Sequence, residues 1–197
     1  MPYFFWSTAR WYSGALCCRY LVVRFGKLYI PMLKDGSTAV SEWHWALGFF
    51  TDGRFEVLGA WQDDGGGTAQ RIAVDLYQRG IERVKAVVAD DHVVDALTGL
   101  RPKVCGRASA ELAASSALGP RMRRVIRWAD IAGLHLQGRM SRVAKLQAPF
   151  ANQAAAAEFI ARAFQRADRD LLHDRLDRAC PAPYGASASA AALAAAN

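Results

Sequence analysis

The sequence predicts an α/β protein: a meander of three antiparallel strands, then a helix, a parallel strand and a helical region. Two Asp-Gly turns separate three segments rich in β-branched and aromatic residues, which is typical of strands joined by hairpins. The pattern then changes to helical spacing, to a short apolar run typical of a buried parallel strand, and back to helical spacing. At 197 residues and 52% apolar content, the chain can bury a core without disulfides, and a wholly disordered chain is excluded.

The meander comes first. Residues 19–33 predict one or two strands, with Pro31 near an edge because proline cannot donate to a ladder. Residues 34–37 predict a turn, and residues 39–50 the return strand. A second turn over 51–54 and a third strand over 55–61 complete the meander.

A helix and a buried strand follow. Residues 63–67 form a loop without a phosphate-binding fingerprint, and Thr68 is a candidate cap for a helix over 69–80 that Gly80 ends. The apolar run in residues 81–89 predicts a parallel strand. That strand delivers Asp90, Asp91 and His92 at its carboxyl end.

The rest of the pattern is helical. Residues 107–118 predict an Ala-rich helix, residues 121–147 one or two basic helices with a break near Gly133 or Gly138, and residues 151–178 a pair of helices. The Pro, Ser, Ala and Gly content after residue 180 predicts a disordered tail.

The net charge of +7 is unevenly spread. Residues 51–100 carry five basic and nine acidic side chains, whereas residues 101–150 carry ten basic and two acidic ones. Acidic clusters hold metal ions and basic blocks neutralise phosphates, so the pair suits a metal-dependent enzyme acting on nucleic acid. The alternative is a solvated basic helix beside an acidic one.

Cysteine usage and hydropathy indicate a cytoplasmic location. The four cysteines have no metal-site or disulfide spacing, which favours a reducing compartment. Residues 1–18 are apolar but lack the basic start and uninterrupted core of a signal peptide. No apolar run approaches the roughly 18 residues of a membrane span, so we expect no membrane role.

Three hairpin strands, a crossover helix and a parallel strand are the opening of a ribonuclease-H-like domain, which holds two metal ions with acids at strand ends. Asp90 is the first candidate ligand; the alternative is an aspartate capping the next turn. Of its neighbours, His92 is favoured over Asp91, because alternate strand residues share a face. Asp63 and Asp64 are either substitute carboxylates or part of a solvated loop.

Basic and aromatic side chains are the other candidates. Arginine binds phosphate with a planar pair of donors, so the basic residues after Pro120 predict sequence-neutral DNA contact; a solvated helix face, partly paired with Asp130, is the alternative. Trp43, Trp45 and Trp61 are expected in the core, and His44, opposite the first two, as a structural residue rather than a ligand. The basic candidates are Arg121, Arg123, Arg124, Arg127, Arg139 and Arg142, extended by Lys145.

The chain resembles bacterial transposases of the mutator type, whose catalytic core is a ribonuclease-H-like DDE domain. YIPMLKDG (29–36) resembles the first hairpin arm, and ALGFFTDGRFEVLGAW (46–61) the strand-turn-strand segment that follows. LYQRGIERVKAVVADDH (76–92) resembles the helix end and the strand that carries the second catalytic aspartate. More loosely, residues 144–164 resemble the helical insertion. The resemblance spans residues 20–170 and is most specific over 46–92.

The resemblance implies an incomplete catalytic site. Gly26 aligns with the first catalytic acid, and Asp90 with the second. Asp91 stands where the family usually has glycine, Cys105 matches a family cysteine without the accompanying histidine, and the third acid has no counterpart. One carboxylate cannot offset two divalent ions, so we expect no full strand-transfer activity.

The resemblance therefore predicts a truncated or degenerate transposase that acts on or binds DNA. It implies Mg²⁺ or Mn²⁺ as cofactor if the site is functional and none otherwise, and it leaves a homo-oligomer open. The alternatives are a non-enzymatic DNA-binding or protein-interaction module on the same fold, and a small unrelated α/β protein. The predicted divisions are an apolar N-terminal segment (1–18), a ribonuclease-H-like core (19–105), a helical insertion-like region (106–178) and a disordered tail (179–197).

Overall fold

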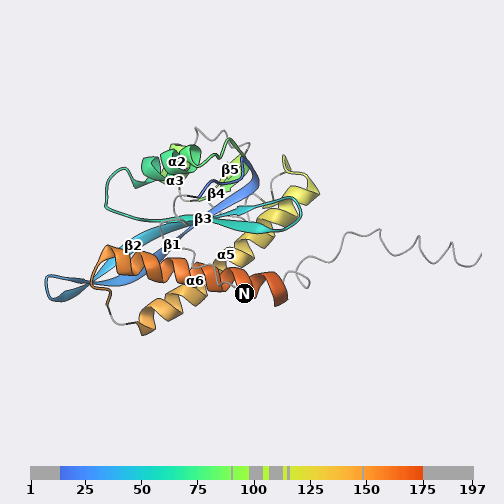
Figure 1. The fold of residues 1–197 in the computed structure, drawn as a ribbon. Helices are drawn as coiled ribbons and strands as arrows, with labels where there is room; N and C mark the ends of the chain where they lie inside the picture. Colours follow the sequence, from blue (N-terminus) through green and yellow to red (C-terminus); the bar gives the residue numbers. More distant parts are fainter. Residues whose placement is uncertain are drawn as a thin grey trace, which may run out of the picture.

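A mixed five-stranded sheet, in the order β3-β2-β1-β4-β5, forms the centre of the protein (Figure 1). The computed structural model describes residues 14–89, 91–97, 104–106, 113–114, 116–147 and 149–174. The strands are β1 (Arg19–Lys34), β2 (Ser37–Phe49), β3 (Phe55–Gln62), β4 (Arg83–Val88) and β5 (Val104–Gly106). The helices are α2 (Thr68–Gln78), α3 (Asp91–Ala96), α5 (Pro120–Leu146) and α6 (Gln153–Asp174). The predicted α/β class is confirmed.

The predicted meander is present, with both Asp-Gly turns. β1 and β2 pair antiparallel from Val22–Phe49 out to Lys34–Ser37, and β2 pairs antiparallel with β3. In the first turn Asp35 and Gly36 both have positive φ, 51° and 75°, the conformation that matches the twist of a two-residue hairpin. β1 is one continuous strand, and Pro31 is accommodated where β1 pairs with β2 but not with β4.

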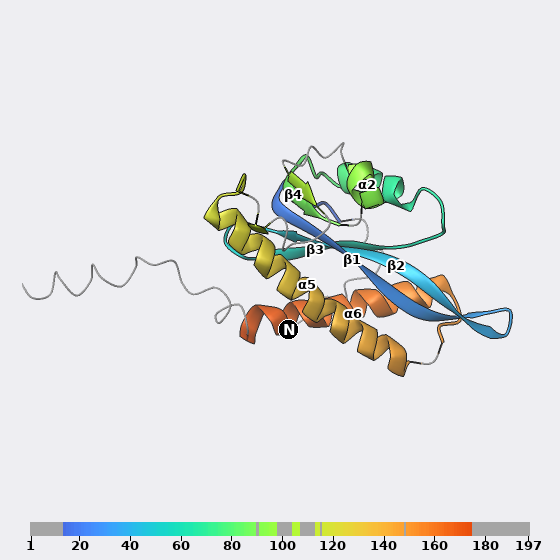
Figure 2. The same cartoon turned by 180° about the vertical axis from the view of Figure 1, so that it is seen from behind.

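β4 is the predicted buried parallel strand. It pairs parallel with the first half of β1, where Val22 lies opposite Ala86 and Arg24 opposite Val88. β5 continues the parallel half of the sheet on the far side of β4. Helices cover both faces of this part of the sheet, as Figures 1 and 2 show. Most side chains of β4 are therefore buried, on both faces, which explains its apolar run.

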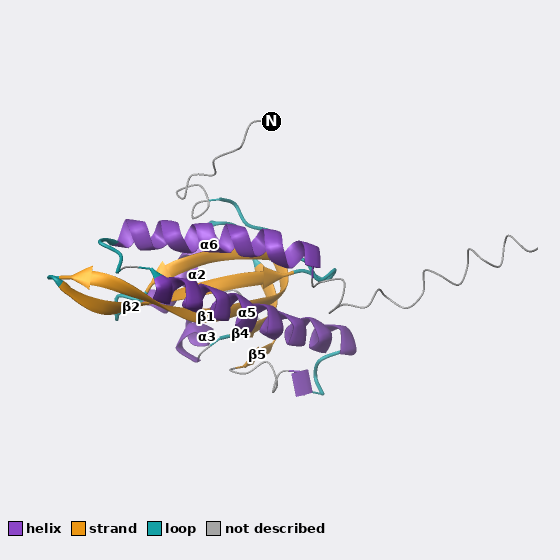
Figure 3. Cartoon of the chain, turned by 90° about the horizontal axis from the view of Figure 1, so that it is seen from below, coloured by secondary structure: helices purple, strands orange, loops and turns teal. Residues whose placement is uncertain are grey.

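The helices lie in two layers. α2 and α3 cover one face of the sheet, and α5 and α6 cover the other (Figure 1); Figure 3 looks onto the face that α5 and α6 cover. Each face has its own apolar core. Ile72 and Leu76 of α2 pack against Val23 and Val87 on the first face. Trp43, Trp45 and Phe49 of β2 pack with α5 and α6 on the second face, with Trp128 and Phe164 among their neighbours.

The helix boundaries differ from three predictions. Thr68 is not the cap of α2: Gly67 is the N-cap, and Thr68 is the first helical residue. The predicted break near Gly133 or Gly138 is wrong, because α5 runs unbroken, with Gly133 against the Arg24 side chain and Gly138 in open space. The predicted helix pair is a single helix, α6, over the described residues. Gly80, at φ 105°, follows the end of α2 as predicted.

The link between α5 and α6 is hydrogen-bonded to β1 in the β1–β2 hairpin. Phe150 forms an isolated parallel bridge with Met32. Its N–H donates to the Pro31 carbonyl at 2.9 Å, and its carbonyl accepts from the Leu33 N–H at 2.8 Å. Phe150 thus adds one strand-like residue to the side of β1 that β4 does not reach.

Three predicted segments lie wholly or mostly outside the described residues: the N-terminal segment up to residue 13, the helix over 107–118 and the tail after Asp174. Within the described ranges, no helix is long and apolar enough to cross a membrane.

Candidate functional site

Gly26, the residue predicted to stand in place of the first catalytic acid, is covered by an indole ring. Gly26 lies on β1 opposite Trp45 of β2. A Cβ atom added to Gly26 would lie 2.1 Å from Cζ2 of Trp45, far inside van der Waals contact. Trp45 is 1% exposed and packs edge-on against Phe164 of α6. The position therefore has neither a carboxylate nor space for one.

The neighbouring residue on this face of β1 is an arginine whose side chain is largely covered. The Arg24 guanidinium lies over the Trp45 ring, 5.6 Å from its centroid, and Nη2 lies 3.1 Å from Oδ1 of Asp130 on α5. Arg24 is 11% exposed at its side chain, and Gly133 of α5 leaves it room. The alternative of a solvated basic face had Asp130 partly paired with that face; Asp130 pairs with Arg24 of β1.

The expected second acid, Asp90, follows β4 in the sequence. Asp90 is outside the described residues, and of His92 only the backbone, within α3, is described. β4 ends at Val88 and α3 begins at Asp91, so the strand alternation that favoured His92 over Asp91 does not apply. Both assignments stay predictions.

The basic residues of α5 form two groups on its outer surface rather than one patch. Arg124 and Arg127 near its start and Arg142 and Lys145 near its end are exposed. They share one side of the helix because they are separated by near-multiples of 3.6 residues. The exposed stripe between the two groups carries Ile131 and Leu134 and no Lys or Arg.

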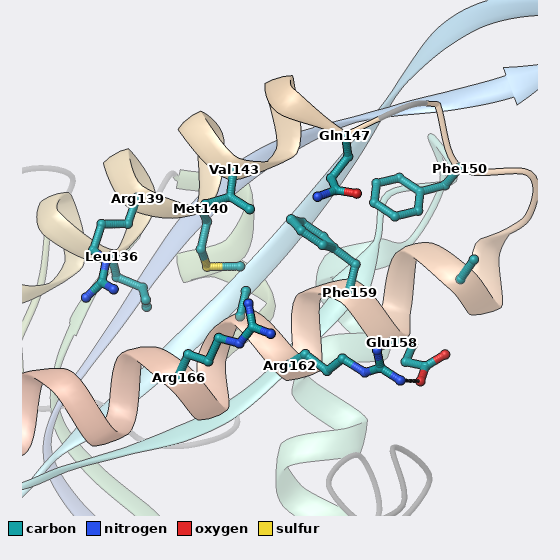
Figure 4. A pocket seen from close by; sticks show the side chains of 12 residues that line it. Leu136, Arg139, Met140, Val143, Gln147, Phe150, Glu158, Phe159, Arg162 and Arg166 are labelled. Carbon is teal, nitrogen blue, oxygen red and sulfur yellow. Dashed lines mark hydrogen bonds and ion pairs between the residues drawn. The ribbon is translucent and has the colours of Figure 1, made fainter.

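The other predicted arginines of α5 point elsewhere. Arg121 donates from Nη2 to the Thr51 carbonyl at 3.1 Å, which ties the start of α5 to the β2–β3 turn. Arg123 is half-buried. Arg139 lines a groove of about 410 Å³ between α5 and α6 (Figure 4). The groove has an apolar floor that includes Met140 and Phe159, with arginines along its walls.

The tryptophans lie as predicted. Trp43 and Trp45 are buried on the α5–α6 face, whereas Trp61 packs on the α2 face and donates from Nε1 to Asp75 at 3.1 Å. The indole N–H groups of Trp43 and Trp45 have no hydrogen-bond partner among the described residues. Apolar packing therefore holds these two rings, and they are not available for base stacking.

A cluster of three metal-ligand types lies on the α2 face of the sheet. Glu42 and His44 of β2 and Asp63 of the loop before α2 have ligand atoms within 4.8 Å of one another. His44, 3% exposed, places Nε2 at 3.4 Å from Oδ2 of Asp63 and 3.9 Å from Oε1 of Glu42. Glu42 was not among the residues predicted from the sequence. The signal was its alternation with His44, since residues two apart on a strand share a face.

Asp63 is held by its own loop. Its Oδ1 accepts the Gly65 N–H at 3.0 Å and the Thr68 hydroxyl at 2.8 Å. The Gly65 hydrogen bond, with contributions from Thr68 and His44, lowers the pKa of the Asp63 carboxyl. Asp64 accepts from Thr68 and pairs with Arg71, so the two aspartates of the loop have different roles.

A model of the Mutator family of transposases matches residues 7–105, about half of the chain. The match includes β1 to α3 and most of β5, and it ends before α5. A search of curated proteins gave no match.

Proposed function

Because the chain belongs to the Mutator family of transposases, we propose that it binds DNA through α5 and that its sheet is a ribonuclease-H-like core with an incomplete metal site. The family implies interaction with DNA. The sheet supports the core assignment: its first three strands are antiparallel, β4 and β5 run parallel to β1, and β1 lies between β2 and β4.

One observation carries the proposal of an incomplete site: Trp45 fills the space above Gly26. Two-metal phosphoryl transfer needs several converging carboxylates. β1 contains no Asp or Glu, so its residues do not fit such a site. We assign no phosphoryl-transfer step to them.

Asp90 is the acid that we propose the chain retains, with His92 as its neighbour. The β1–β4 register supports this, because Val88 pairs with Arg24, two residues before Gly26 on β1. A Mg²⁺ or Mn²⁺ ion at Asp90 would lack the carboxylate expected from β1. The fold is therefore proposed to serve DNA binding rather than strand transfer, which favours the non-enzymatic DNA-binding alternative.

The two basic groups of α5 are proposed to contact phosphates. Arg124 and Arg142 are 18 residues apart, which spans ~27 Å of helix. Phosphate contacts release counterions, and each lowers the slope of log K against log salt by about 0.9 on B-DNA. The uncharged stripe between the groups predicts two separate backbone contacts and no base reading.

Fluorescence anisotropy with a duplex, titrated between 50 and 200 mM salt, tests DNA binding. The double variant Arg124→Ala/Arg127→Ala should weaken binding and make the salt slope shallower by about 1.8. Arg54→Ala is the matched control, because Arg54 is exposed and paired with Asp52 in the β2–β3 turn. Unchanged binding by the double variant, or an equal loss in the control, would remove α5 from the proposal.

A nicking assay with Mg²⁺ or Mn²⁺ tests the incomplete site. We expect no cleavage of supercoiled or linear DNA by the full chain. Metal-dependent nicking that Asp90→Asn abolishes would overturn the proposal and show that other carboxylates complete the site.

A further inference from the structure

We propose that Glu42, His44 and Asp63 form a binding site for a divalent transition-metal ion. The three side chains come from the middle of the meander and from the loop before α2. No step of the proposed DNA binding uses them.

The separations between the donor atoms are close to those a metal requires. With bonds of about 2.1 Å in tetrahedral geometry, two ligand atoms lie about 3.4 Å apart. Nε2 of His44 and Oδ2 of Asp63 already have this separation, 3.4 Å. Glu42 Oε1 lies 3.9 Å from the same nitrogen, and all three ligand atoms lie within 4.8 Å of one another. Binding thus needs a small rotation of one glutamate.

Two of the three ligands are fixed before any ion arrives. His44 is 4% exposed at its side chain, so its ring is held by packing. Oδ1 of Asp63 is taken by the Gly65 N–H and the Thr68 hydroxyl, and Oδ2 faces His44. Hydrogen bonds of this kind orient ligands in metal sites. Asp63 and Glu42 are each 28% exposed, so an ion can enter from solvent.

The donor set selects the kind of ion. One imidazole nitrogen with two carboxylate oxygens suits Zn²⁺ and related transition metals, and it leaves a fourth position for water. Mg²⁺ prefers oxygen ligands and keeps its waters. The donor set of this site therefore differs from the all-oxygen set that Mg²⁺ prefers.

Lys27 competes with the ion. Its ammonium lies 2.7 Å from Oε1 of Glu42, on the strand beside β2. A metal ion that takes Glu42 must displace this contact, so Lys27 weakens the site. Removing the lysine charge should therefore strengthen metal binding, a result that a purely structural ion-pair network does not predict.

Isothermal titration of the full chain with ZnCl₂ tests the site. All proteins carry Cys17→Ser and Cys18→Ser, because these two adjacent thiols are exposed and would bind zinc themselves. We expect one site of micromolar affinity and no heat with MgCl₂. Glu42→Gln and Asp63→Asn should each weaken zinc binding at least tenfold, and Lys27→Gln should strengthen it severalfold. Zinc should also shift the ¹⁵N resonance of His44 Nε2.

Two controls separate this site from others. Asp52→Asn removes an exposed acid from the turn at the other end of the β2–β3 hairpin and should leave the zinc affinity unchanged. Asp90→Asn should also leave it unchanged, so failure here and failure of the proposed function are distinguishable. Absent zinc binding, binding that survives both Glu42→Gln and Asp63→Asn, or binding lost in Asp90→Asn would overturn the proposal. Should Asp63→Asn fail to fold, as judged by circular dichroism, Glu42→Gln decides.

Discussion

Replacing Gly26 by alanine tests whether Trp45 closes the position of the first acid. The new methyl would lie 2.1 Å from Cζ2 of Trp45, against an ordinary carbon–carbon contact of about 3.5–4.0 Å. The ring must therefore move by about 1.5 Å. It is fully buried, between the Arg24 guanidinium and Phe164, so it cannot move without disturbing both. Overpacking of this kind costs about 2–3 kcal/mol.

Urea unfolding, followed by circular dichroism at 222 nm, measures this cost. With a denaturant slope of about 2 kcal/mol/M, the midpoint of Gly26→Ala should fall by about 1 M. Trp45→Ala alone should cost about 3–5 kcal/mol, because it leaves a large cavity. In that background Gly26→Ala should cost almost nothing, which gives a coupling energy of about 2 kcal/mol.

The control for this cycle is Gly138→Ala. Gly138 lies on α5 with open space around it and an ordinary helical φ, so alanine should stabilise the protein by up to about 1 kcal/mol. The reasoning is refuted if Gly26→Ala is neutral in the wild-type protein, or if its cost persists after Trp45 is removed. A neutral Gly26→Ala would mean that position 26 has space for a side chain, and a cost that persists without Trp45 would mean that another contact excludes one.

Three further predictions concern stability. Asp130→Asn should lower the free energy of unfolding by about 2 kcal/mol in urea melts, because it leaves the Arg24 charge buried; the cost is below that of a fully buried pair, since Asp130 is 35% exposed. Burial, with the 2.6 Å hydrogen bond to Glu56, raises the pKa of Tyr20. Because the unfolded chain loses the Tyr20 proton more easily, the free energy of unfolding should be unaffected by this group below pH 10 and should fall as the pH rises above 10. Absorbance at 295 nm should show one tyrosine that ionises only on unfolding, and Tyr20→Phe should remove that signal. Gly36→Ala should destabilise the hairpin by about 1 kcal/mol, because Gly36 has φ 75°, and thermal melts would show it; an unchanged melting temperature would contradict the turn geometry.

Short sequence patterns were enough to predict the meander and the parallel strand β4. Both Asp-Gly turns and the apolar run of β4 are short-range patterns with one structural solution each, and all three were confirmed. The continuity of α5 could not be predicted, because the reason for it is not local. Gly133 is tolerated in mid-helix where it leaves room for Arg24, which is more than a hundred residues away in the sequence.

The candidate site was only partly predictable for the same reason. The sequence shows that Gly26 is no acid, but only the sheet register reveals that Trp45 covers it. The alternation of Glu42 and His44 is visible in the sequence. Their meeting with Asp63 is not, because it depends on the pairing of Trp43 with Gln62, which ends β3 beside this point of β2.

Phe150, the residue that joins the α5–α6 link to the β1–β2 hairpin, covers backbone groups at the far end of β1. The matched family region ends before α5, yet Phe150 supplies backbone hydrogen bonds to β1 from beyond it. An unpaired strand edge invites pairing with another chain. A relative that exchanged these two helices for other elements would have to supply a residue in the place of Phe150, or shorten its hairpin, to avoid aggregation. In this chain the α5–α6 link and the far end of the hairpin therefore satisfy each other's backbone hydrogen bonds.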